Sequence, residues 1–116
     1  MIERRKFIRL SAPIGISYRP MKKGRSGKPT VSFVRNIGGG GVRFVVRDSF
    51  LAGDLLEMKI EIPNVTDPIR AVGEVVWYSE GAERKREGGE VGVKFREIDP
   101  KDLHRVLEYV HAVGIG

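Results

Sequence analysis

Two arginines near the N-terminus are the first residues whose type and spacing could bind a ligand. Arg5 and Arg9 lie in the segment Arg5-Lys6-Phe7-Ile8-Arg9, just ahead of the first apolar run. Each guanidinium is a planar fork that can grip a phosphate, or the O6/N7 edge of guanine, through two hydrogen bonds; one such base contact is worth about 1–3 kcal/mol. A solvated basic tail would show the same spacing, so the pair alone leaves both interpretations open.

A run of four glycines is the second such feature. It occurs in Asn36-Ile37-Gly38-Gly39-Gly40-Gly41, between two segments of alternating hydrophobicity. Consecutive glycines cost conformational entropy, which indicates unusual backbone angles or a close approach to the main chain. Backbone N–H groups in such a turn can also meet an anion. The alternative is a loose hairpin turn.

Catalytic chemistry finds little support in the sequence. His104 and His111 are seven residues apart, and no neighbouring pattern of carboxylates or thiols completes a metal site with them. The chain has no cysteine, no Gly-x-Ser-x-Gly elbow and no phosphate loop of the Walker type. We therefore expect a protein that is not an enzyme and that carries no metal or other cofactor.

The positive charge is concentrated at the N-terminus. The net charge is +6, and residues 1–28 hold nine Lys or Arg against a single acidic residue, Glu3. A positive pole on an otherwise balanced body indicates an anionic partner: a nucleotide, a nucleic acid, an acidic protein or a membrane surface.

The candidate ligand residues must be positioned by strands, which the alternation of apolar and polar residues predicts. Apolar and polar residues alternate clearly at 56–62, as in a half-buried antiparallel strand, and turn-forming residues separate this run from its neighbours. The stretch 72–78 is more uniformly apolar, which predicts a strand covered on both sides. The other expected strands are 14–18, a segment beginning at 31, 42–47 and 90–95. The pattern predicts an all-β fold, a small six-stranded antiparallel barrel.

A C-terminal helix should pack on this barrel. Asp99-Pro100 is typical of a helix N-cap followed by proline in the first turn, and Leu103, Val106, Leu107 and Val110 then recur with helical spacing. We expect one domain over 1–116, with a flexible basic arm at 1–12, the barrel at 13–98 and the helix at 99–113. The absence of cysteine, of a signal sequence and of a spanning apolar run predicts a cytoplasmic protein without membrane insertion.

Taken together, the two motifs resemble the signature of the PilZ domain family. That signature is Arg-x-x-x-Arg near the N-terminus, followed by Asp/Asn-x-Ser-x-x-Gly at a strand turn, which correspond here to Arg5, Arg9, Asn36 and Gly41. The flanks are similar too, as in Gly40-Gly41-Val42-Arg43-Phe44, Gly73-Glu74-Val75-Val76-Trp77 and Gly92-Val93-Lys94-Phe95. The resemblance extends over nearly the whole chain.

The resemblance implies a receptor for the bacterial second messenger cyclic di-GMP (c-di-GMP) that signals to an effector protein. The implied ligand residues are Arg4, Arg5, Arg9, Asn36, Gly38, Gly39, Gly40 and Gly41. Arg5 and Arg9 would clamp guanine edges and phosphates, Asn36 would hydrogen-bond a guanine, and the N-terminal segment would fold over the ligand. One position departs from the signature, because Gly38 replaces its serine and removes a hydroxyl.

Two alternatives remain. A PilZ-like domain that has lost nucleotide binding could serve as a protein-interaction module, an interpretation that the missing serine favours and the retained arginines oppose. A small barrel could also bind single-stranded nucleic acid through its basic pole. That function needs exposed aromatic residues beside the basic ones, and Phe7 and Tyr18 are the only aromatics in the basic segment; we expect nucleic acid not to be the partner.

Overall fold

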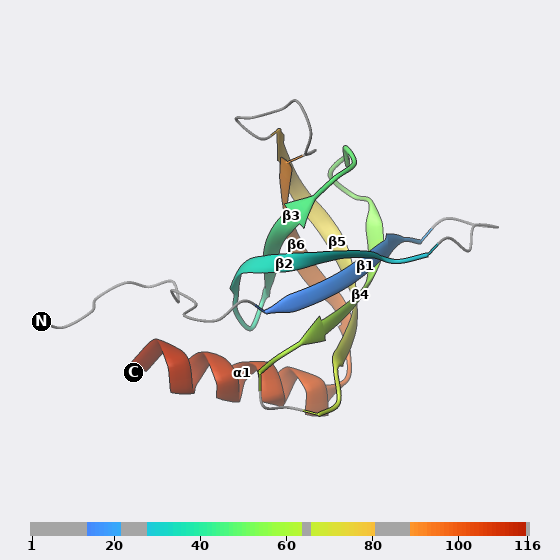
Figure 1. Cartoon of the computed structure of the whole chain (residues 1–116). Coiled ribbons are helices and arrows are strands. Elements are labelled where there is room, and N and C mark those ends of the chain that lie inside the picture. The colour runs from blue at the N-terminus through green and yellow to red at the C-terminus, as the bar shows by residue number, and fades with distance from the viewer. Residues whose placement is uncertain (1–13, 22–27, 64–65, 81–88, 116) are drawn as a thin grey trace, which may run out of the picture.

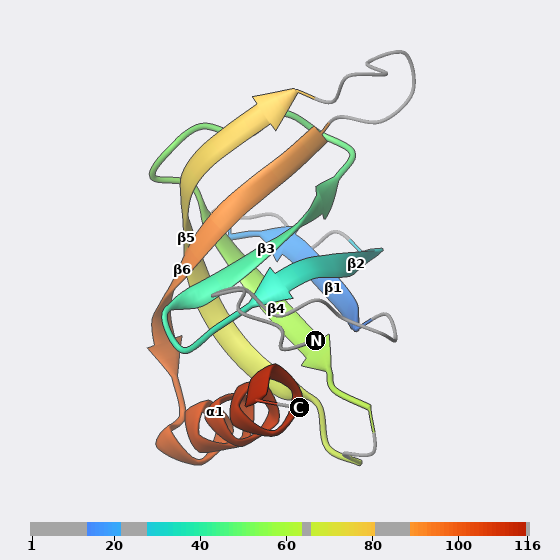
Figure 2. The same cartoon turned by 90° about the vertical axis from the view of Figure 1, so that its left-hand side faces the viewer.

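The strands of the protein close into a barrel, and a single helix lies across one end of it (Figures 1 and 2). The computed structural model describes residues 14–21, 28–63, 66–80 and 89–115. The elements in chain order are β1 (Gly15–Pro20), β2 (Thr30–Ile37), β3 (Gly41–Val46), β4 (Leu55–Glu61), β5 (Ile69–Glu80), β6 (Gly89–Ile98) and α1 (Pro100–Ile115).

All neighbouring strands in the barrel are antiparallel. Their order around the barrel is β1-β2-β3-β6-β5-β4, and β1 closes the sheet by pairing with both β2 and β4. Closure removes the exposed edges that an open sheet would present. The predicted fold class, a six-stranded antiparallel barrel with a C-terminal helix, is confirmed.

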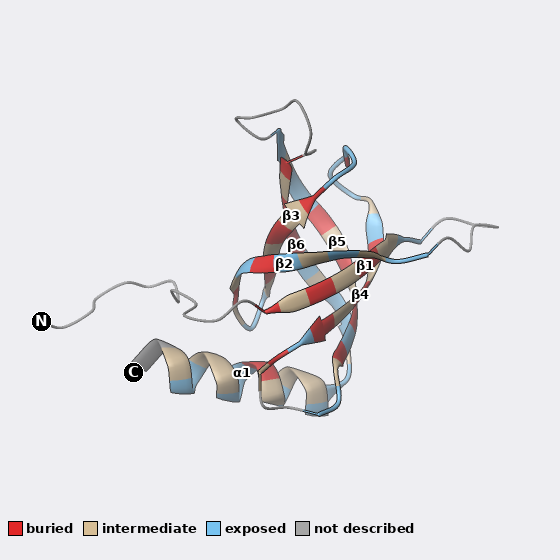
Figure 3. Cartoon of the chain, viewed as in Figure 1, coloured by how far each residue is buried: buried red, intermediate tan, exposed pale blue. Residues whose placement is uncertain are grey.

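The core consists of the inward-facing residues of the strands together with Ile14, Phe50, Ile62 and Val106, seen among the buried positions in Figure 3. Tyr18 is the largest of the fully buried side chains, and its ring lies 5.2 Å from that of Phe44. The Tyr18 hydroxyl accepts a hydrogen bond of 3.2 Å from the backbone N–H of Arg47. Burial is the main cause that raises the pKa of this hydroxyl. The alternation read from the sequence therefore corresponds to the inside and outside of the barrel.

The prediction that residues 72–78 form a strand covered on both sides is wrong. In β5 the side chains of Val76 and Trp77 are 51% and 40% exposed. The pairing of β5 with β6 shifts register between Val75 and Trp77, a bulge that turns Trp77 to the outside opposite Gly92. The apolar run therefore contributes to the core and to an outer face of the barrel.

Helix α1 begins as the sequence predicts and ends two residues beyond the predicted boundary. The Oδ1 atom of Asp99 accepts a hydrogen bond of 2.8 Å from the backbone N–H of Lys101, as an N-cap does. Val106 is fully buried against the barrel, and Arg105 donates to the carbonyl of Asp67 at 2.7 Å. Leu107, which was expected on the packing face, is 46% exposed. Within the described ranges, no helix is long and apolar enough to span a membrane.

Candidate functional site

A bulge in β2 directs Asn36 to the outer face of the barrel. Val34 pairs with Phe44 on the inner face, whereas the next pair in the ladder is Asn36 with Arg43, so Arg35 is the extra residue. Ile37 then returns to the inner face opposite Val42 and is buried. The amide of Asn36 thus lies beside the outward-facing residues of β3.

The turn that follows is fixed at both ends by backbone hydrogen bonds. The N–H of Gly38 donates to the carbonyl of Gly41 at 3.0 Å, and the N–H of Phe95 donates to the carbonyl of Gly40 at 3.0 Å. The N–H of Gly38 is therefore engaged within the turn, so it is not one of the free donors that the glycine run suggested. Two other glycines, Gly53 and Gly89, have a positive φ in the described structure.

The glycine run indicated that something lies close to its main chain, and in the structure other parts of the protein do so. A Cβ on Gly41 would lie 2.1 Å from the carbonyl oxygen of Val93 in β6. A Cβ on Gly39 would lie 2.8 Å from the Cδ2 atom of Leu107 in α1, whereas Gly38 and Gly40 have open space at that position. Gly41 is thus required by the pairing of β3 with β6, and Gly39 lets the helix lie against the turn.

A hollow of about 380 Å³ opens beside this turn on the outer face of β2, β3, β5 and β6. Of the predicted residues, Asn36, Gly40 and Gly41 line it, whereas Gly38 and Gly39 are not part of its wall. The remaining lining residues are Val42, Arg43, Val76, Trp77, Gly92, Val93 and Lys94. The structure therefore brings part of the predicted glycine motif together with a tryptophan and two cations.

Cross-strand pairing explains this gathering. Gly41 pairs with Lys94, and Gly92 pairs both with Arg43 on one side and with Trp77 on the other. Sequence reasoning did not assign Arg43, Trp77 or Lys94 to the site. The strand alternation already placed Arg43 and Lys94 among the polar, outward residues, but the bulge that exposes Trp77 has no signal in the sequence.

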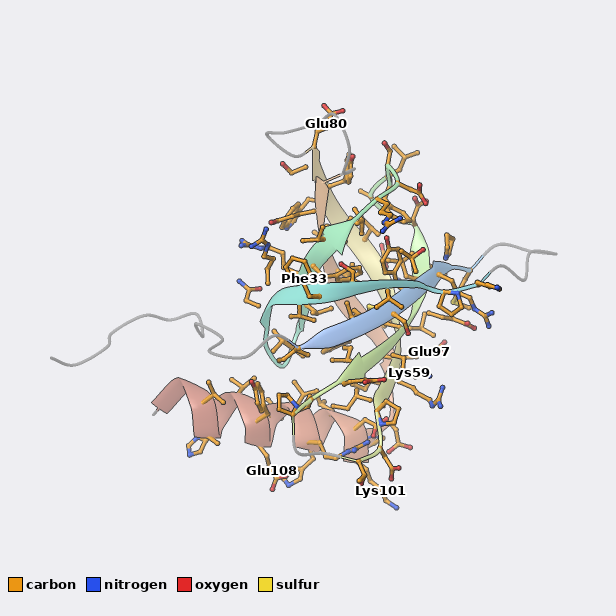
Figure 4. The ribbon with its side chains drawn as sticks, viewed as in Figure 1. Phe33, Lys59, Glu80, Glu97, Lys101 and Glu108 are labelled. Carbon is orange, nitrogen blue, oxygen red and sulfur yellow. The ribbon has the colours of Figure 1, made fainter. Side chains whose placement is uncertain are left out.

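One carboxylate balances two arginines at the edge of the hollow. The Oε2 atom of Glu90 lies 3.0 Å from Nε of Arg35, and its Oε1 atom lies 3.3 Å from Nε of Arg43. The guanidinium of Arg35 also lies 5.3 Å from the centre of the Phe33 ring, which projects from β2 (Figure 4). The local charge thus remains positive, since Lys94 adds to this group.

A larger hollow, of about 810 Å³, lies elsewhere on the barrel, on β1, β4, the beginning of β5 and the end of β6. Neither Asn36 nor the glycine turn lines it, and its wall carries charges of both signs, including Lys59 and Glu97 (Figure 4). We place the candidate site in the smaller hollow because Asn36, Gly40 and Gly41 of the predicted motif line it. In the described part of the chain, no cluster of His, Cys, Asp and Glu could hold a metal ion.

The other predicted site residues, Arg4, Arg5 and Arg9, lie outside the described residues. They do fall within the part of the chain matched by a family model, which is described as the PilZ domain and covers residues 3–112. The chain belongs to the PilZ domain family. The PilZ match includes both motifs read from the sequence, and the barrel with its C-terminal helix is the PilZ fold.

Solved structures share this PilZ fold at low sequence identity. The inhibitor of motility MotI/DgrA of Bacillus subtilis has a TM-score of 0.70 at 22% identity, with 96% of this chain and 51% of that chain covered. MrkH of K. pneumonia has a TM-score of 0.74 at 12% identity, with 98% and 52% covered. The PilZ domain of YcgR from Escherichia coli, solved with c-di-GMP, has a TM-score of 0.65 at 10% identity, with 97% and 92% covered.

The chain therefore spans about half the length of the MotI/DgrA and MrkH chains and nearly all of the YcgR domain. A comparison with curated proteins found no match. At these identities, the structural likenesses establish the fold alone.

Proposed function

We propose that this PilZ domain is a non-catalytic receptor for c-di-GMP that passes the signal to an effector protein. The observation that carries the proposal is the position of Asn36 and the glycine turn at a hollow that also holds Trp77, Arg43 and Lys94. Family membership and the c-di-GMP in the YcgR domain support the choice of ligand.

The residues of the hollow suit the chemistry of a guanine dinucleotide. An amide such as that of Asn36 can hydrogen-bond the edge of a guanine, and an indole offers a face on which a base can stack. Base–aromatic stacking of this kind is worth about 1–3 kcal/mol per base. Arg43 and Lys94 supply positive charge for phosphates, and we propose that Arg5 and Arg9, with Arg4 beside them, complete the site from the N-terminal segment.

Gly38 should weaken the binding of c-di-GMP. The family signature has a serine here, and glycine offers no hydroxyl. Binding would then depend more heavily on the arginines and on the indole.

Single-stranded nucleic acid is the principal rival ligand. Of the aromatics in the basic N-terminal segment, Tyr18 is only 1% exposed and cannot stack on a base, while Phe7 lies outside the described residues. Phe33 and Trp77 are partly exposed near basic side chains, so the rival deserves a direct comparison.

Titration calorimetry with c-di-GMP, and separately with a short oligonucleotide, tests the proposal at two salt concentrations. We expect low-micromolar or tighter binding of c-di-GMP and no binding of the oligonucleotide. Oligonucleotide binding that weakens steeply with salt would favour the nucleic-acid function instead. A folded protein that binds neither ligand would favour the protein-interaction module.

A further inference from the structure

We propose that Arg43 is a ligand-binding arginine supplied by the barrel itself, and that Glu90 is the residue that positions it. The inference rests on the proposed function, and it adds a phosphate contact outside the two signature motifs. Its basis is the shared carboxylate that joins Arg35 and Arg43 beside the hollow.

Arg43 occupies the middle of the site. It pairs with Asn36 on one side and with Gly92 on the other, and it lines the hollow. Its side chain is 43% exposed, yet its Nε atom is buried, lies 3.3 Å from Oε1 of Glu90 and makes no hydrogen bond within the described part of the chain. The Nε atom is therefore close enough to Glu90 for an ion pair but is not aligned for a hydrogen bond, and the exposed part of the side chain is available to an anion.

Arg35 differs from Arg43 although the same carboxylate contacts both. Arg35 is held from two directions, by Glu90 at 3.0 Å and by the Phe33 ring at 5.3 Å, and it does not line the hollow. This difference makes Arg35→Ala a matched control for Arg43→Ala. Each replacement removes one arginine from the same carboxylate, but only Arg43→Ala removes an arginine from the wall of the site.

Glu90 is suited to fix the direction of Arg43. It is only 29% exposed, and its two oxygens face arginines from two neighbouring strands. Holding a long side chain in place before binding lowers the entropy that is lost when the ligand binds. Without the carboxylate, the two guanidinium groups would repel each other and Arg43 would lose its support.

This role of Glu90 predicts an effect opposite in sign to that of simple charge. Replacement of Glu90 by glutamine removes a negative charge beside an anionic ligand, and Coulomb attraction alone would then tighten binding. If Glu90 positions Arg43, the same replacement weakens binding. The sign of the change therefore separates positioning from net charge.

The experiment measures c-di-GMP affinity by calorimetry for the parent and for Arg43→Ala, Arg35→Ala and Glu90→Gln, with thermal unfolding of each. We expect Arg43→Ala to weaken binding about tenfold or more. Arg35→Ala should stay within about threefold of the parent, and Glu90→Gln should bind several-fold more weakly while remaining folded. Parent-like affinity of Arg43→Ala, or tighter binding by Glu90→Gln, overturns the inference and leaves the proposed function standing.

A second readout does not depend on c-di-GMP. The side-chain Nε–H resonances of Arg35 and Arg43, followed by NMR, should both move in Glu90→Gln, and that of Arg43 should move when inorganic pyrophosphate is added. If the parent fails to bind c-di-GMP, the proposed function is wrong, and pyrophosphate then decides the inference alone. An Arg43 resonance that does not respond to pyrophosphate overturns it.

Discussion

The indole of Trp77 lies directly against Gly92, so closely that a Cβ on Gly92 would be 2.2 Å from the indole Nε1. The two residues pair across β5 and β6, just beyond the bulge at Val75. Glycine at position 92 thus leaves the space in which the ring is seated at the wall of the hollow. The position of the Trp77 ring on β5 therefore depends on the absence of a side chain at Gly92 on β6.

Replacement of Gly92 by alanine should therefore displace Trp77. We expect a loss of about 1–3 kcal/mol in the free energy of unfolding, measured with denaturant, because the new methyl group overlaps the ring. In a Trp77→Ala background the same replacement should cost much less, since the clashing ring is gone. An equal cost in both backgrounds would contradict the contact.

The four glycines of the turn should differ sharply in their tolerance of a side chain. Gly41→Ala should destabilise the protein by about 1–3 kcal/mol or more, because its Cβ meets the backbone of Val93. Gly40→Ala is the matched control: it has open space and no positive φ, so its stability should be unchanged or higher by about 0.4–1 kcal/mol. Equal losses at both positions would show that the run is needed for flexibility rather than for strand contact.

Gly38→Ser should restore the hydroxyl of the family signature. The position has open space for a Cβ and no positive φ, so the folded state should accept the side chain. A hydrogen bond to a charged phosphate is worth about 1.5–3 kcal/mol, which predicts an increase of about tenfold or more in c-di-GMP affinity. Calorimetry tests this, and tighter binding that Arg9→Ala abolishes would place both motifs in one pocket. A folded Gly38→Ser protein with unchanged affinity would mean that the ligand does not reach this turn.

Tyr18 should make stability depend on alkaline pH. Because burial raises its pKa in the folded protein above the ordinary 10.0, the folded state holds the proton more tightly than the unfolded state. The corresponding stability is fully present below pH 10 and is lost as the pH rises through the folded pKa. Denaturant unfolding of the parent and of Tyr18→Phe measures this contribution. Above pH 10, the free energy of unfolding should fall more steeply with pH for the parent than for Tyr18→Phe, which has no hydroxyl to titrate.

Tyr109→Phe is the companion measurement, because burial also raises the pKa of Tyr109. Tyr109 is less buried than Tyr18, so its replacement should alter the alkaline slope less. Identical alkaline slopes for the parent and Tyr18→Phe would contradict the assignment to Tyr18.

Local sequence patterns were enough to predict the elements that depend on residues close together in the chain. The start of α1 could be read from Asp99-Pro100, and the strands could be read from alternation, because both signals lie within one element. The bulge that exposes Trp77 depends on how β5 pairs with β6, so periodicity misread this strand as covered on both sides.

Pairing across the barrel also determines the residues that sequence reasoning missed. Arg43 and Glu90 are far apart in the chain, and no spacing rule connects them. Leu107 fits the helical apolar stripe, but only the position of the turn shows that it lies against Gly39 rather than in the core. Asn36 and Gly41, which both line the hollow, could be singled out from the sequence because they belong to one contiguous motif of the family signature.

The fluorescence of Trp77 during titration with c-di-GMP tests the central claim most directly, because Trp77 is the only tryptophan of the chain and lines the proposed site. We predict a saturable change at low-micromolar ligand that Arg5→Ala and Arg9→Ala weaken by about tenfold or more. Arg19→Ala should leave it unchanged, because Arg19 lines the larger hollow and not the proposed site, and is paired with Glu57. Calorimetric binding without any change at Trp77, or equal losses from all three replacements, would contradict the account.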